Sequence, residues 1–152
     1  MTEDYRLLVT GTRRLHEAGR KLVRERLAVH LELAKKAGQR LVVVQGECIS
    51  GADQEARAWG WLMKRAGEPV EVESHHPTKH PTQDFGKWPE CGPRRNKYMV
   101  GLGAVACEAF IDSCNSPRCR QPGIHPSHGA SGCADLAEAA KIPTVRSDLW
   151  KT

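Results

Sequence analysis

Short apolar runs alternate with longer amphipathic segments along the chain, and this alternation predicts a parallel sheet flanked by helices. Strands are expected at 7–9, 41–44, 70–72, 105–111 and 144–146, and helices at about 17–37, 50–67, 93–102 and 131–141. The run from Leu41 to Val44 contains no polar position, which is typical of a central parallel strand buried on both faces. The sequence therefore predicts one α/β domain over residues 1–152, with five parallel strands in the order 3-2-1-4-5.

Glycine, proline and short polar residues mark the expected helix ends. Gly38 and Gly67 follow the first and second helices and supply C-terminal stops. Ser50 and Asp53 form an approximate capping box at the start of the second helix, with aspartate in place of the preferred glutamate. Pro93 fits the first turn of the third helix, because the N–H group that proline lacks has no intrahelical partner there.

Two glycine-rich segments each lead into a predicted helix. The first runs from Gly46 to Asp53 after the second strand, and the other runs from His128 to Asp135. Such a segment gathers the backbone N–H groups of a turn and of a helix N-terminus, where the helix dipole favours an anion. The sequence therefore predicts a phosphate-binding site.

Four polar segments, 11–14, 46–53, 94–96 and 127–135, are expected to meet at the carboxyl edge of the sheet, where open α/β sheets bind ligands. Arg95 in the first turn of a helix opposes the helix dipole, which favours a role at the site. Asp53 has two interpretations, a carboxylate stabilised at a helix start or an acceptor for a ribose or base. The predicted ligand-binding residues are Gly11, Thr12, Arg13, Gly46, Glu47, Gly51, Asp53, Arg95, Asn96, Gly129 and Ser131.

Four motifs in one order resemble the YspA-like proteins of the SLOG superfamily. They are Val9-Thr10-Gly11-Thr12-Arg13, Gly46-x4-Gly51-Ala52-Asp53 with Trp59, Gly92-Pro93-x-Arg95-Asn96-x2-Met99, and Gly129-Ala130 followed by Ala134. The resemblance covers nearly the whole chain apart from an insert at 112–128. It implies a Rossmann-like, doubly wound sheet that binds a nucleotide or an ADP-ribose-like phosphorylated nucleoside, as a ligand sensor or a sequestering protein. Compact relatives of this kind are common in actinobacteria and their phages.

The chain also resembles, more distantly, the LOG nucleoside-monophosphate phosphoribohydrolases. Arg95 and Met99 match their Arg-x3-Met motif. In their second motif, Ala130, Cys133 and Leu136 stand where those enzymes have a glycine, a threonine and the catalytic glutamate. The departures therefore affect the catalytic motif and leave the ligand-binding motif in place.

Acidic residues near the altered motif are out of register with the catalytic position. Asp135 and Glu138 lie nearby, but a helix turns by about 100° per residue, so the offset aims each carboxylate in another direction. Binding without hydrolysis is the main prediction. An N-glycosidic hydrolase that uses Glu47, Asp53 or Asp135 is the alternative, and no catalytic residue is assigned.

The insert at 112–128 carries a separate pattern of metal-ligand residues. Cys114, Cys119, His125 and His128 fall within fifteen residues, which suits a tetrahedral zinc knuckle, although Cys133 is an alternative to His128 as fourth ligand. The insert is nearly devoid of apolar side chains, so a metal would supply the ordering that burial cannot. Four protein ligands leave no open position for water, so the predicted zinc is structural. The competing interpretation is a loop with incidental or redox-active thiols.

Composition and charge limit the partners and the location. Charged residues make up 27% of the 152 residues, the mean hydropathy is −0.53, and no apolar stretch has the length of a membrane span. Most of the net charge of +5 is attributed to solvated helix faces such as Arg20-Lys21 and Lys35-Lys36, and the compact cluster at 94–97 is the part expected to attract an anionic, nucleotide-derived small molecule. Only 5% of residues are aromatic, and no basic run is interleaved with them. This argues against nucleic acid as a partner, and a single-stranded nucleic-acid binder is kept as a further alternative. Pairing into a homodimer is left open.

The acidic start at Met1–Asp4 lacks the apolar core of a signal peptide, so we expect a cytoplasmic protein with reduced cysteines.

Overall fold

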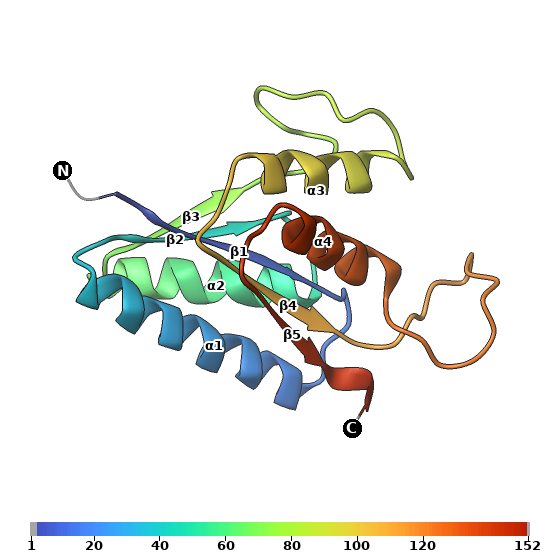
Figure 1. Ribbon diagram of the computed structural model, residues 1–152, viewed down its shortest axis with the longest axis horizontal. Helices are drawn as coiled ribbons and strands as arrows, with labels where there is room; N and C mark the ends of the chain where they lie inside the picture. The colour runs from blue at the N-terminus through green and yellow to red at the C-terminus, as the bar shows by residue number, and fades with distance from the viewer. Residues whose placement is uncertain (1–2, 152) are drawn as a thin grey trace.

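The computed structural model describes residues 3–151, and Figure 1 shows them as one sheet between two layers of helices. The elements are β1 (Tyr5–Gly11), α1 (Glu17–Lys36), β2 (Leu41–Gln45), α2 (Gly51–Arg65), β3 (Val70–Ser74), α3 (Cys91–Gly101), β4 (Ala106–Ile111), α4 (His128–Ala139), β5 (Thr144–Asp148) and the short 3-10 helix η1 (Leu149–Lys151). Met1 and Thr2, on which the expected cytoplasmic location partly depends, and Thr152 lie outside the described residues. Across 3–151, no helix combines the length and apolar character needed to cross a membrane.

The sheet is parallel throughout, in the order β3-β2-β1-β4-β5, which confirms the predicted topology. The central strand β1 pairs with β2 on one side and with β4 on the other. Because the strands run the same way, the segments that follow them emerge along one edge. The chain changes winding direction between β1 and β4, which is where ligands bind in open α/β sheets.

Alternate residues of β1 pack on opposite faces of the sheet. Leu7 and Val9 contribute to the core under α1 and α2, where Trp59 is also buried. Leu8 contributes to the core under α3 and α4, together with Cys107 of β4. Figure 1 shows the same division, with α1 and α2 on one face and α3 and α4 on the other. The structure thus has the doubly wound, Rossmann-like form that the sequence predicts.

The ends of the first two helices agree in part with prediction. Gly38 has a positive φ of 67°, and the N–H of Gln39 donates to the carbonyl of Ala34, so α1 stops as expected. The prediction of a capping box at the start of α2 is wrong, because the side chain of Ser50 makes no capping hydrogen bond. The buried carboxylate of Asp53 instead accepts from the N–H of Cys48 at 3.4 Å.

The other two helices begin earlier than predicted. α3 begins at Cys91, so Pro93 still falls within its first turn. α4 begins at His128, and the N–H of Ser131 donates to the carbonyl of Ser127 at 3.0 Å. Gly129 therefore belongs to the first turn of a helix and not to a separate glycine turn. Sequence rules interpret glycine as a turn, whereas a helix tolerates it in its first turn, where few intrahelical bonds depend on it.

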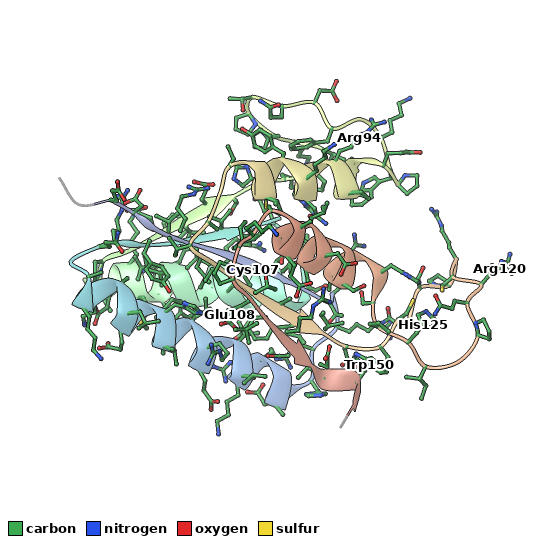
Figure 2. All side chains as sticks on the ribbon, in the orientation of Figure 1. Arg94, Cys107, Glu108, Arg120, His125 and Trp150 are labelled. Carbon is green, nitrogen blue, oxygen red and sulfur yellow. The ribbon has the colours of Figure 1, made fainter. Side chains whose placement is uncertain are left out.

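A fully buried carboxylate ties α1 to the sheet. Glu108 of β4, labelled in Figure 2, accepts hydrogen bonds from Arg26 at 2.8 Å and contacts His30 Nε2 at 2.7 Å, both from α1. Burial raises the pKa of Glu108, but the bonds from His30 and Arg26 outweigh it, and the pKa lies below its usual value. The carboxylate is therefore charged and paired inside the core, as a buried charge must be.

A second ion pair makes stability depend on pH. Arg6 donates to both carboxylate oxygens of Glu73, at 2.7 and 2.8 Å, and His75 Nε2 lies 2.7 Å from the same group. Hydrogen bonds from Arg6 and His75 lower the pKa of Glu73 from 4.5 to about 2. Because the folded pKa is depressed, the pair stabilises the fold above about pH 4.5 and loses this effect as the pH falls toward 2.

Replacing Glu73 with glutamine is expected to flatten the loss of stability between about pH 4.5 and pH 2. Urea unfolding at several pH values measures this for the wild type and the variant. Glu3→Gln, which removes an exposed carboxylate, is the control and should keep the wild-type slope. Equal slopes for wild type and Glu73→Gln would contradict the assignment.

Candidate functional site

A cleft of about 1010 Å³ opens at the carboxyl edge of the sheet. Its walls come from the β1–α1 loop, the turn after β2, the start of α3 with the loop before it, and the β4–α4 segment with the first turn of α4. Of the predicted ligand-binding residues, those that line the cleft are Gly11, Thr12, Arg13, Gly46, Asp53, Arg95, Asn96 and Gly129. The structure thus brings together residues that lie far apart in the sequence.

Three predicted ligand-binding residues do not line the cleft. Gly51 lies against the β1–α1 loop, where an added Cβ would stand 2.0 Å from the carbonyl oxygen of Thr12. The hydroxyl of Ser131 donates back to the carbonyl of Ser127 at 2.7 Å, within the first turn of α4. Glu47 holds a left-handed backbone with a φ of 57°, at the turn after β2.

The glycines of the cleft serve the packing of the protein itself. A Cβ on Gly46 would stand 2.6 Å from the guanidinium carbon of Arg95. A Cβ on Gly11 would stand 2.3 Å from the Cβ of Ala52, at the start of α2. Both distances are shorter than van der Waals contact. Gly11 is required for the approach of its neighbours, because it also faces the backbone oxygen of Phe110 at 2.8 Å, whereas a side chain at Gly46 would force the guanidinium of Arg95 to shift.

The first glycine turn already uses several of its N–H groups. The N–H of Ala52 donates to the carbonyl of Thr12 at 3.1 Å, and the N–H of Glu47 donates to the side chain of Gln45 at 2.6 Å. The N–H of Cys48 donates to Asp53. The amide of Ala52 thus holds the start of α2 against the β1–α1 loop, and those of Glu47 and Cys48 bond to side chains near the turn, so these three amides are not available to cradle a phosphate.

Arg95 forms part of the cleft floor. Its side chain is buried, and its guanidinium donates to the carbonyl of Gly46 at 2.5 Å, to the carbonyl of His75 at 3.4 Å and to the amide oxygen of Asn96 at 2.8 Å. Gly46 follows β2 and His75 follows β3, so one side chain links the ends of two strands. Sequence reasoning found the position, and the structure shows this linking role.

The buried carboxyl of Asp53 lies on the same floor. Burial raises its pKa, while the nearby charge of Arg95 acts in the opposite direction. Burial and the neighbouring Asp53 together raise the pKa of the Cys48 thiol to about 11. The floor therefore offers a polar acceptor at Asp53 and no reactive thiolate at Cys48.

Exposed basic side chains and an indole ring line the rim. Arg13, Arg14 and Arg118 border the cleft, and across residues 3–151 none of them lies within ion-pairing distance of a carboxylate. The guanidinium carbon of Arg13 lies 5.4 Å from the ring centroid of Trp88, whose side chain is 53% exposed. Trp88 and Arg118 were not predicted at the site, and Arg14 was predicted at this edge only as part of the segment 11–14, without a ligand-binding role. A tryptophan within a long polar loop was the available signal for Trp88.

Two carboxylates near the altered LOG motif face elsewhere. Asp135 and Glu138 both accept from Arg146 Nη2 at 2.6 Å, and neither lines the cleft. Of the carboxylates named for the hydrolase alternative, Asp53 lines the cleft and Glu47 and Asp135 do not.

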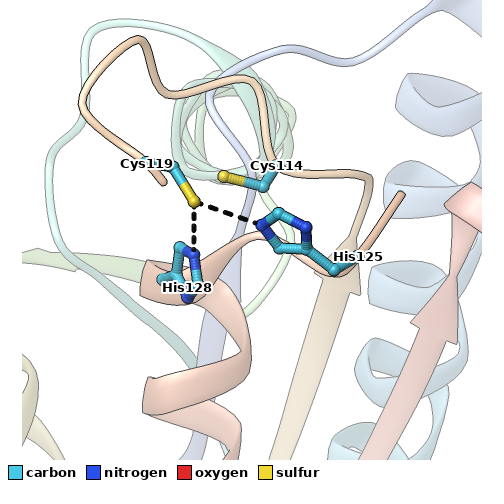
Figure 3. A group of neighbouring side chains, drawn as sticks. All are labelled: Cys114, Cys119, His125 and His128. Carbon is cyan, nitrogen blue, oxygen red and sulfur yellow. Dashed lines mark hydrogen bonds between the residues drawn. The ribbon is translucent and has the colours of Figure 1, made fainter. Parts of the chain in front are cut away.

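The predicted metal ligands form one cluster beside the cleft. Ligand atoms of Cys114, Cys119, His125 and His128 all lie within 4.8 Å of one another (Figure 3). The alternative prediction, that Cys133 replaces His128 as fourth ligand, is wrong. The side chain of Cys133 is buried in the core under α3 and α4 and is not part of the cluster. Burial raises the pKa of that thiol to about 11.

Comparison with known proteins identifies the fold and no family. No protein-family model and no curated protein matches the sequence. Among solved structures, the chain resembles DNA processing protein A from Helicobacter pylori, which was studied for its mode of binding single-stranded DNA. The TM-score is 0.58 at 18% sequence identity, and the match covers 93% of this chain and 64% of that one. The chain thus spans less than two thirds of the length of that protein.

Proposed function

We propose that the cleft binds single-stranded nucleic acid through phosphate and base contacts. The observation that carries this proposal is the rim, where Arg13, Arg14 and Arg118 have no carboxylate partner among residues 3–151 and Arg13 lies over the exposed ring of Trp88. Guanidinium groups bind phosphates, and an exposed indole provides a stacking surface for a base. Proteins that bind single strands without strong sequence preference combine these two features.

Along the sequence, basic and aromatic residues do not alternate within any one run, which counts against nucleic acid as a partner. The fold brings the two kinds of side chain together from separate segments, because Arg13 follows β1 and Trp88 precedes α3. The shared fold with DNA processing protein A agrees with this proposal and suggests DNA as the strand.

A free nucleotide derivative is the second candidate, and the cleft floor favours it. Asp53 and Asn96 offer polar groups that suit a ribose or base, deeper than the arginines of the rim. The resemblance to YspA-like proteins implies such a ligand, held by a sensor or sequestering protein. The cleft volume of about 1010 Å³ lies at the upper end of the range for small-molecule sites, so both ligand sizes fit.

Titration of fluorescently labelled dT12 against the protein distinguishes the two candidates. We expect binding that weakens steeply with salt, because each neutralised phosphate of a single strand contributes a slope of about 0.7 in log affinity against log salt. Unlabelled ADP-ribose and AMP serve as competitors. Displacement of dT12 by micromolar ADP-ribose would favour the small molecule, and no binding of dT12 at low salt would overturn the nucleic-acid proposal.

Two variants are expected to weaken dT12 binding at the rim. Trp88→Ala removes the stacking surface and should cost about 1–3 kcal/mol, or roughly 5-fold to 150-fold in affinity. Arg13→Ala should lower the salt slope by about 0.7. Trp61→Ala and Arg65→Ala are matched controls, since both side chains are exposed on α2 and neither lines the cleft. Equal losses in the rim and control variants would contradict a site at the cleft.

A further inference from the structure

Backbone hydrogen bonds join the two ends of the segment between β4 and α4. Ser113 and Pro126 form an antiparallel bridge, the N–H of Cys114 donates to the carbonyl of His125 at 2.8 Å, and the N–H of Ser127 donates to the carbonyl of Asp112 at 2.9 Å. These bonds place Cys114 and His125 opposite each other at the base of a loop.

The loop and the helix supply the other two ligands. Cys119 lies in the loop, where its N–H donates to the carbonyl of Ser116 at 3.2 Å, and His128 is the first residue of α4. Figure 3 shows both side chains pointing toward Cys114 and His125. Four ligand atoms thus come from three different backbone environments and meet at one point.

The distances between ligand atoms suit a tetrahedral metal. Cys119 Sγ lies 3.3 Å from His125 Nε2 and 3.2 Å from His128 Nε2. Bonds of about 2.3 Å to sulfur and 2.0 Å to nitrogen place tetrahedral ligand atoms about 3.3–3.8 Å apart. The two sulfur–nitrogen distances lie at or just below this range, and every other pair of ligand atoms lies within 4.8 Å, so shifts of the side chains alone would enclose an ion.

The hydrogen bond at Nδ1 fixes the tautomer of the His125 ring. His125 Nδ1 lies 2.9 Å from the carbonyl oxygen of Gly123, and a carbonyl only accepts, so Nδ1 carries the proton. Nε2 then presents a lone pair toward Cys119. A hydrogen bond that fixes the tautomer in this way is the usual outer contact of a metal-binding histidine.

The segment has little else to hold it in place. Residues 115–118 and 120–124 are exposed, and the one large apolar side chain among them, Ile124, is 80% exposed. Figure 2 shows this segment, with Arg120, projecting from the rest of the molecule. Burial therefore contributes little to ordering the loop.

We propose that Cys114, Cys119, His125 and His128 bind one Zn²⁺ ion, which fixes the 112–128 segment in place. Two sulfur and two nitrogen ligands favour zinc over the hard cations Mg²⁺ and Ca²⁺, which take oxygen ligands. Each thiol releases its proton on binding, so two thiolates balance the charge of the ion. With four protein ligands the site is closed, and the metal is structural.

Metal analysis of tag-free protein, purified without chelators, tests the site. We expect about one zinc per chain in the wild type and a loss of at least tenfold in Cys119→Ser. Cys48→Ser is the matched control and should keep the zinc, since Cys48 lies outside the cluster. His125→Ala is likewise expected to lose zinc, and His76→Ala is its matched control and should keep it, since His76 lies outside the cluster.

Cobalt titration of the metal-free wild type provides a second measurement, which does not depend on whether a variant folds. Tetrahedral Co²⁺ with two thiolate ligands is expected to give intense visible bands and a sulfur-to-metal charge-transfer band, at one equivalent per chain. Addition of Zn²⁺ should bleach these bands. Absence of both bound zinc and the tetrahedral cobalt spectrum would overturn the proposal, whatever ligand the cleft binds.

Discussion

Replacing Arg95 with alanine is expected to lower the free energy of unfolding by about 3–5 kcal/mol, because it removes a buried charge together with its hydrogen bonds. The carbonyls of Gly46 and His75 lose a donor, and Asp53 loses the nearby positive charge that opposes the rise in its pKa. For a chain of this length, such a loss corresponds to a fall in Tm of about 10 °C or more. Thermal and urea unfolding measure the effect.

Arg94→Ala is the matched control for Arg95→Ala. Arg94 is the preceding residue of the same helix, but it is exposed, and within residues 3–151 its guanidinium donates to the carbonyl of Phe85 alone, at 3.3 Å. Its replacement should change stability by less than about 1 kcal/mol. Adding Asp53→Asn to Arg95→Ala should recover part of the loss. If Arg95→Ala kept the wild-type Tm and lost only its affinity for dT12, Arg95 would be a ligand contact and not a support for the cleft floor.

The fold was predictable because its signals are local and repeated. The apolar run at 41–44 identifies a central strand on its own, and glycines such as Gly38 end helices by a backbone conformation that few other residues adopt. Once the strands alternate with helices, a parallel sheet and a ligand site at its carboxyl edge follow from general rules of topology. None of these steps requires knowledge of distant contacts.

The chemistry of the cleft was less predictable because it depends on contacts between distant segments. Arg95 in a first helical turn indicates a site when only its own helix is considered. The carbonyls of Gly46 and His75, which lie 49 and 20 residues away in sequence, change that interpretation. Trp88 gains significance only because the β1–α1 loop carries Arg13 to its ring. A sequence pattern cannot show which of the loops at the carboxyl edge of the sheet contact one another.

The Cys/His cluster is an intermediate case. Its four members lie within one short segment, so their spacing alone predicted the set that the structure brings together. The choice between His128 and Cys133 needed the structure, because α4 begins three residues earlier than expected and turns Cys133 into the core. A shift in one helix start thus decides which side chain faces the cluster.

Stripping the metal is expected to release the segment 112–128 and to weaken dT12 binding by about tenfold or more. Structural zinc sites contribute roughly 10–16 kcal/mol of binding free energy in small peptides, and here that energy holds a segment with few buried contacts. Cys114, Arg118 and His128 all line the cleft, so disorder of the segment removes one of its walls. The zinc-bound site has no net charge, because two thiolates balance the Zn²⁺ ion. The expected loss of dT12 affinity therefore comes from disorder of the segment and not from a change in the charge of the cleft.

Hydrogen exchange and dT12 titration, before and after chelation, separate the possible outcomes. The amides of Cys114 and Ser127, which bond across the base of the loop, should lose protection, while those of the central strand β1 keep theirs. In the Cys119→Ala variant, the amides of Cys114 and Ser127 should lack protection from exchange whether or not chelator is added. Unchanged protection in metal-free protein would contradict an ordering role for the ion. If protection falls but dT12 binds neither form, the nucleic-acid proposal fails while the metal site stands, because the exchange measurement needs no ligand.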